Sequence, residues 1–216
     1  MGQAARNFAA MDEPALVAEA KLGEREAFRA IMQRYNQRLF RVARAVVGDD
    51  AEAEDVLQEA YLRAFAGIAA FRGEAGLLTW LTAIALNEAR GRLRKRRPMV
   101  DLEAAAAANV VPFAPQPPDP ESEAARTETR QLLETSIDGL PPEFRVVFVL
   151  REIEGLSVEA TAAQLGLNPA TVKTRHFRAR RMLRAGLEKK LLAGLGDVFP
   201  FLGVRCSNVA ARVLER

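Results

Sequence analysis

Apolar residues recur at intervals of three and four positions along most of the chain, and no stretch alternates regularly between apolar and polar positions. This period is that of an α-helix that buries one face, whereas half-buried strands alternate with a period of two. The segment at residues 24–47 carries a clear stripe of this kind, made of Ala27, Ile31, Tyr35, Leu39, Val42 and Val46. The pattern predicts an all-α protein.

Glycines, prolines and short polar stretches divide the helical pattern into two groups of predicted helices. The first group forms a domain at residues 11–97, with helices at residues 13–21, 24–47, 51–65 and 77–96. The second forms a domain at residues 126–190, with helices near residues 125–137 and 143–154 and a further pair between residues 157 and 185. Residues 191–216 form a C-terminal extension to which the sequence assigns no role.

The stretch at residues 98–125 is predicted to link the two helical domains. It contains six prolines and a run of alanines. A linker of this composition is expected to be flexible, and its ends would lie about 30 Å apart on average. That distance would let the two domains reach DNA sites about two helical turns apart.

Residues 157–185 have the pattern of a helix-turn-helix. Ser157 is a good N-cap for the first helix, Gly166 ends that helix, and Asn168 with Pro169 begins the second. In DNA-binding proteins the second helix of such a pair enters the major groove. Here it would present a cationic face that contains Lys173, Arg175, Arg178, Arg180 and Arg181.

Charge is distributed unevenly along a chain whose net charge is only +3. Six of the eight residues at 90–97 are basic, and eight more basic residues fall between positions 173 and 190 against one acid. Two separate contacts with a polyanion are therefore indicated. By contrast, residues 49–62 contain six acids and no base, which favours a surface that faces protein rather than DNA.

Several classes of function have no support in the composition. The chain has one cysteine, Cys206, and one histidine, His176, so neither a disulfide nor a Cys/His metal site is expected, and we predict no metal and no cofactor. A lone histidine on a basic helix is more often a phosphate or solvent contact than a proton-transfer group, and catalysis is not indicated. Without a signal peptide or an apolar run long enough to span a bilayer, we expect a cytoplasmic protein that does not insert into membranes.

Asp55, Gln58 and Glu59 lie at positions i, i+3 and i+4 of the acidic helix and therefore share one face. Such a set could dock against arginines of a partner protein. From spacing alone, an ordinary solvated helix face is the more common explanation by about two to one.

Residues 71–97 place a glycine-containing loop before a helix that begins apolar and becomes strongly basic. A cationic helix beside exposed loop aromatics is suited to holding an unstacked base. Trp80 lies on the apolar stripe, so burial in the core is favoured over base stacking. For Phe71, which lies close to Gly73, the two roles are about evenly balanced. The basic end of the helix could also be a favourable interaction with the helix dipole, but six cations exceed what that requires.

Three stretches, AEDVLQEAYLRAF, FRGEAGLLTWLTAIALNEARGRLRK and LPPEFRVVFVLREIEGLSVEATAAQLGLNPATVKTRHFRARRMLR, together resemble those of a known family. In order and spacing the chain is similar to extracytoplasmic-function (ECF) sigma factors, which are promoter-specificity subunits of bacterial RNA polymerase. The resemblance implies a helical-bundle domain at residues 11–97 and a helix-turn-helix domain at residues 126–190, and a protein that binds rather than catalyses.

The resemblance also implies roles for individual residues. Asp55, Gln58 and Glu59 would bind the clamp helices of the large polymerase subunit. The −10 promoter element would be contacted by Phe71, Arg72, Asn87, Arg90, Arg94 and Arg97. The −35 element would be contacted by Lys173, Thr174, Arg175, Phe177, Arg178 and Arg180. The polymerase flap and an anti-sigma factor are the further partners that the resemblance implies.

A stand-alone helix-turn-helix regulator, whose first domain binds a ligand or forms dimers, is the alternative function. It would bind DNA tightly without polymerase, at a two-fold symmetric site with half-sites one turn apart. An all-α enzyme is a distant third, because the sequence offers no recognisable catalytic constellation.

Overall fold

The computed structural model describes residues 7–96 and 120–195. Its regular elements are all helical, in agreement with the fold class predicted from the sequence. Within those two ranges, no helix combines the length and the apolar character needed to cross a membrane. Residues 98–119 of the predicted linker lie outside the described residues, as do Arg97, Cys206 and most of the C-terminal extension.

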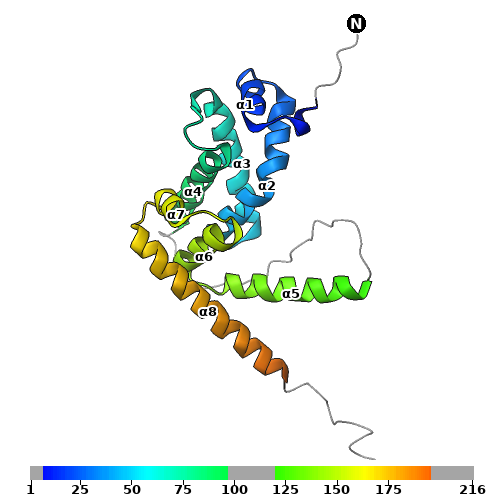
Figure 1. The fold of residues 1–216 in the computed structure, drawn as a ribbon, viewed down its shortest axis with the longest axis vertical. Helices are drawn as coiled ribbons and strands as arrows, with labels where there is room; N and C mark the ends of the chain where they lie inside the picture. Colours follow the sequence, from blue (N-terminus) through cyan, green and yellow to red (C-terminus); the bar gives the residue numbers. More distant parts are fainter. Residues whose placement is uncertain (1–6, 97–119, 196–216) are drawn as a thin grey trace, which may run out of the picture.

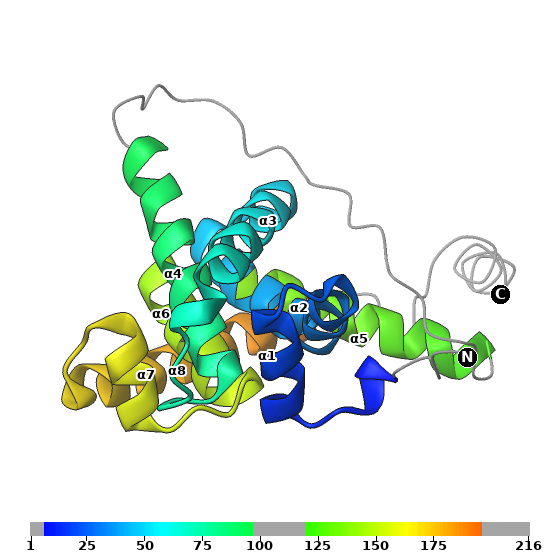
Figure 2. The same cartoon turned by 90° about the horizontal axis from the view of Figure 1, so that it is seen from above.

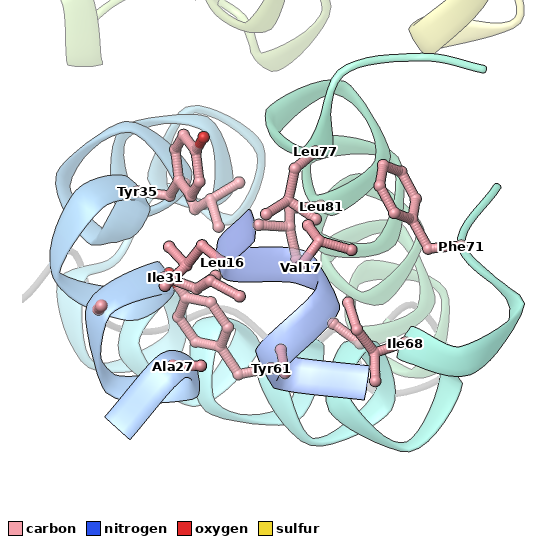
Figure 3. Packing of buried hydrophobic residues seen from close by; sticks show 14 of the residues in the cluster. Leu16, Val17, Ala27, Ile31, Tyr35, Tyr61, Ile68, Phe71, Leu77 and Leu81 are labelled. Atoms are coloured by element: carbon pink, nitrogen blue, oxygen red, sulfur yellow. The ribbon is translucent and has the colours of Figure 1, made fainter. Parts of the chain in front are cut away.

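The first domain is a bundle of helices, preceded by a short 3-10 turn, η1 (Phe8–Ala10), and broken by a second turn, η2 (Ile68–Ala70). Its helices are α1 (Glu13–Lys21), α2 (Arg25–Val47), α3 (Asp50–Gly67) and α4 (Leu77–Arg96). They enclose an apolar core in which Leu16 of α1, Ile31 and Leu39 of α2 and Leu77 of α4 are almost fully buried. Figure 3 shows Leu16 and Val17 of α1 between Tyr35 on one side and Phe71 on the other.

The second domain contains the predicted helix-turn-helix. Its helices are α5 (Pro120–Asp138), α6 (Pro142–Phe148), α7 (Val158–Leu165) and α8 (Pro169–Leu195). The chain continues from α6 as a π-helical turn, η3 (Val149–Ile153), where the sequence predicts one uninterrupted helix. Helix α5 begins with Pro120, inside the stretch predicted as linker, because proline is favourable at the first position of a helix.

The caps of the helix-turn-helix confirm the local predictions. The side chain of Ser157 accepts a hydrogen bond from the backbone N–H of Ala160 at 3.0 Å. Gly166 ends α7 in the left-handed conformation at φ +64°, and Asn168 accepts from the N–H of Ala170 at 2.8 Å. The turn therefore sets α7 and α8 against each other through groups that are all local in sequence.

The two domains pack against each other. Helix α6 packs against α2, and α7 packs against α4; Figure 1 shows α6 near the lower end of α2 and α7 beside α4, and Figure 2 shows the same helices from above. One apolar cluster joins them, with Val42, Val46, Leu86 and Ala89 from the first domain and Val146, Val147, Leu150 and Leu165 from the second. Because this cluster is continuous across the boundary, the free chain adopts a closed arrangement in which each domain buries apolar surface of the other.

Candidate polymerase and nucleic-acid interfaces

The outward face of α3 carries the acidic set identified in the sequence. Asp55 and Gln58 are exposed, with 61% of the Asp55 side chain accessible to solvent, and Glu59 is half-buried. The opposite face of the helix is anchored in the core by Val56 and Ala60. The structure therefore brings the three predicted residues together on one accessible surface.

Ion pairs connect this surface to α4. These pairs were not predicted from the sequence. Nη1 of Arg92 lies 3.0 Å from Oδ2 of Asp55. Arg63 lies between two glutamates, with Nε 3.1 Å from Glu59 and Nη2 3.1 Å from Glu88. The pairs made by Asp55 and Glu59 are exposed and contribute little to stability, whereas Glu88 is only 12% exposed.

The loop between η2 and α4 is exposed in its middle and buried at its ends. Arg72 is solvent-accessible and its Nη1 lies 3.9 Å from Glu74. Phe71 is only 8% exposed, and its ring packs against Trp80 with the two ring centroids 5.2 Å apart. Trp80 packs against the apolar core, as expected. Both aromatic rings therefore pack on the core side of the loop. A direct contact of Phe71 with DNA stays a prediction.

Helix α4 presents part of its basic end to solvent. Asn87 and Arg94 are exposed, whereas Arg90 is half-buried and its Nη2 donates to the carbonyl oxygen of Leu165 in α7 at 3.1 Å. Burial, with a smaller contribution from the charge of Arg94, lowers the pKa of Arg90. The helix-turn-helix domain therefore covers one of the residues predicted to contact the −10 element.

Helix α8 exposes most of the side chains predicted to read DNA. These are Lys173, Thr174, Phe177, Arg178 and Arg180. Phe177 is 66% exposed although it is a large apolar side chain, so its ring is accessible on the same helix as the exposed cations. His176 instead turns toward η3, where its Nε2 lies 2.6 Å from Glu152.

Arg175 differs from its neighbours on α8 because it faces the boundary between the domains. With Arg90 it lines a cavity of about 200 Å³ whose other walls include Val46, Glu143, Val146 and Leu165. Residues predicted to contact two separate promoter elements therefore lie around one cavity in the closed chain.

Charged residues that the sequence analysis did not single out hold the domains together. The carboxylate of Glu154, with only 3% of its side chain exposed, accepts from Nε of Arg38 at 2.6 Å and from Nε of Arg41 at 2.8 Å. Arg145 is also buried and donates from Nε to the carbonyl oxygen of Ala45 at 2.8 Å. Burial is the main reason that the pKa of Arg145 is lowered.

Arg44 forms a second link between the domains. Its guanidinium donates to both carboxylate oxygens of Asp138, at 2.6 and 2.8 Å, and also pairs with Asp50. Burial opposes its charge, but the two carboxylates outweigh that effect and raise the pKa of Arg44 overall. The three-residue spacing of arginines along α2 was the only sequence signal for these links, and it is also common on solvated helices.

Comparisons with known proteins agree with this architecture. Residues 31–98 match the family model of sigma-70 region 2, and residues 130–183 match that of sigma-70 region 4. The ECF RNA polymerase sigma-E factor of Haemophilus influenzae is 33% identical over 178 residues, which cover 80% of this chain and 94% of that protein. The sigma-E factor of Escherichia coli K12 is 32% identical, with 80% and 93% covered.

Solved structures show the same fold. CnrH, in complex with the cytosolic domain of CnrY, matches with a TM-score of 0.57 and 27% identity over 82% of this chain and 97% of that one. The sigma factor RpoE of Bartonella quintana, in complex with the anti-sigma factor NepR, matches with a TM-score of 0.56 and 24% identity over 73% of this chain and 96% of that one.

The chain belongs to the ECF sigma factor family. It is a non-enzymatic transcription factor that directs RNA polymerase to promoters. The presence of both regions in one chain, region 2 followed by region 4, decides against the alternative of a stand-alone helix-turn-helix regulator.

Proposed function

We propose that the exposed face of α3 binds the clamp helices of the large polymerase subunit through Asp55, Gln58 and Glu59. The observation that carries this proposal is the accessibility of Asp55 and Gln58 on a helix whose other face is buried. Charge-assisted hydrogen bonds from arginines of the partner would replace the exposed pair that Asp55 makes with Arg92.

DNA contacts are proposed at two places. The loop at residues 71–78, whose residues 72–76 are exposed, would recognise and help to open the −10 element together with Asn87, Arg90 and Arg94 of α4. Lys173, Thr174, Phe177 and Arg178 of α8 would enter the major groove of the −35 element, with Arg175 and Arg180 nearer the backbone. Phosphate contacts would position the helices, and contacts with base edges would provide the specificity.

The closed arrangement must open for both elements to be bound at once. Arg90 is held by Leu165 and lines the same cavity as Arg175, whereas the promoter elements would lie about two helical turns apart, within reach of a flexible linker. We propose the domains at residues 11–97 and 126–190 as the two units that separate, with the flap of the polymerase binding the second.

An anti-sigma factor is proposed as a further partner, because the similar proteins CnrH and RpoE were solved with CnrY and NepR. The site of action would be the cytoplasm, where the polymerase transcribes.

Charge reversal tests the polymerase interface. The double variant Asp55→Arg/Glu59→Arg should lose binding to core polymerase in a pull-down, whereas Glu24→Arg, at an exposed position before α2 and outside the proposed acidic face, should bind as the unmodified chain does. Retention of core binding by the double variant would contradict the proposal.

A further inference from the structure

The loop that precedes α4 is held at both ends by side chains of one other helix, α1. Nζ of Lys21 donates to the carbonyl oxygen of Phe71 at 2.7 Å. At the other end, Oε1 of Glu13 accepts from the backbone N–H of Leu77 at 2.8 Å. Residues 72–76, between these two points, are exposed. Helix α1 therefore sets where the loop begins and ends while its middle stays accessible.

The contact made by Glu13 compensates for a missing local cap. Gly76 precedes the first residue of α4 and has no side chain with which to satisfy the free N–H groups of the first turn. The carboxylate of Glu13 takes that role from a distant position, and its charge is favourable at the positive end of the helix dipole. A Cβ atom at position 76 would lie 3.8 Å from the same carboxylate oxygen, so the two chain segments approach closely.

Glu13 is itself held in place. Its second oxygen accepts from the hydroxyl of Tyr35 at 2.5 Å, which ties it to α2. On the adjacent turn of α1, Leu16 and Val17 are buried in the core between Tyr35 and Phe71 (Figure 3). The two anchoring side chains therefore extend from a rigid helix, which is the condition for positioning a loop accurately.

We propose that Glu13 and Lys21 are positioning residues for promoter opening: they fix both ends of the loop at residues 72–76, so that it is held ready for a base extruded from the −10 element. The inference rests on the proposed role of that loop. It adds a function for α1, which precedes the segment matched by sigma-70 region 2. A loop already ordered before binding loses less conformational entropy when it captures a base.

The test uses holoenzyme reconstituted from core polymerase and the full chain. The probe is a single-stranded oligonucleotide with the non-template −10 sequence and a fluorescent base analogue beside the captured position. Lys21→Met keeps the apolar stem but removes the donor, and Glu13→Ala removes the acceptor. Each should weaken binding of the oligonucleotide about tenfold, equivalent to about 1.4 kcal/mol, while affinity for core polymerase and for a −35 duplex is unchanged.

Conservative variants and a matched control separate positioning from helix stability. Lys21→Arg restores a donor, so oligonucleotide binding should return to within about twofold of the unmodified chain. Asp12→Ala removes the N-cap of the same helix, whose carboxylate accepts a hydrogen bond from the backbone N–H of Ala15 at 2.9 Å, but leaves both loop anchors intact. Binding by Asp12→Ala should stay at the unmodified level.

Two outcomes would overturn the inference. One is unchanged oligonucleotide binding by both Lys21→Met and Glu13→Ala. The other is an equal loss of oligonucleotide binding in Asp12→Ala, which would show that α1 affects binding only through the stability of the fold. Failure of the proposed function looks different: the unmodified holoenzyme would then bind −10 and scrambled oligonucleotides equally well, whatever the variants do.

Discussion

Arg38 and Glu154 lie 116 residues apart in the sequence, yet Nε of Arg38 donates to the carboxylate of Glu154 at 2.6 Å. The same carboxylate also accepts from Arg41, so one buried acid of the helix-turn-helix domain pairs with two cations of the other domain. Buried charges are tolerated only when paired in this way. This contact joins the two domains in the closed arrangement, alongside the apolar cluster that they share.

Glu154→Gln should open the chain. The glutamine keeps an oxygen but loses the charge that compensates Arg38 and Arg41. Removal of one partner of a fully buried ion pair costs about 3–5 kcal/mol, but the two arginine side chains are 38% and 34% exposed, so solvent screening should reduce the cost below that range. Small-angle scattering of the free protein should then give a larger radius of gyration. Glu134→Gln, at an exposed position on α5, is the control. A radius unchanged in Glu154→Gln would show that the ion pairs do not hold the domains closed.

The two tyrosines of the chain should resist ionisation. Burial, aided by the hydrogen bond and charge of Glu13, raises the pKa of Tyr35 to about 12, and burial raises that of Tyr61 even further above its ordinary value of 10.0. Because the folded state disfavours the phenolate, this contribution to stability is complete below pH 10 and is lost as the pH rises toward 12. Phenolate absorbance at pH 10 should be nearly absent in the native protein and half-developed in denaturant; equal absorbance in both would contradict the burial of the rings.

Gly48→Ala and Gly186→Ala should have opposite effects on stability. Gly48 ends α2 at φ +79°, and a Cβ there would lie 3.0 Å from the Arg145 guanidinium, so alanine should lower the free energy of unfolding by about 1–3 kcal/mol. Gly186 lies inside α8, where a Cβ would meet nothing within 4 Å, and alanine should raise it by up to about 1 kcal/mol. Denaturant titration measures both, and a stabilised Gly48→Ala would be incompatible with the left-handed cap.

Lys173→Ala and Phe177→Ala should separate the two kinds of −35 contact. Loss of a phosphate contact at Lys173 should weaken holoenzyme binding on all sequences and reduce the salt slope by about 1. Loss of the exposed ring of Phe177 should instead reduce discrimination at one base pair, by about 1–3 kcal/mol, with the salt slope unchanged. Binding titrations at several salt concentrations, on matched and mismatched duplexes, distinguish these results.

Local features of the fold could be predicted because their causes are local. The apolar stripe of α2, the Ser157 cap and the Gly166 end of α7 all depend on residues within a few positions of one another. The predicted bounds of α1, residues 13–21, agree with the structure for the same reason. The interruption of α6 by η3 was not predicted, since nothing in the segment distinguishes a π-helical turn from an α-helix.

Features that depend on distant residues could not be predicted. The spacing of Arg38 and Arg41 indicates a helix face but not Glu154 as the partner. The same is true of Glu13, whose place at the start of α4 follows only from the packing of α1. For Phe71 the sequence favoured neither burial in the core nor base stacking. Its packing against Trp80 depends on how η2 and α4 lie relative to each other.

In vitro transcription with purified core polymerase tests the central claim most directly. We predict promoter-specific initiation when the unmodified chain is added, and none when Asp55→Arg/Glu59→Arg replaces it, although that variant should still fold. Initiation no better than that of core polymerase alone, over a genomic pool of promoters, would contradict the assignment of this chain as a subunit that directs polymerase to DNA.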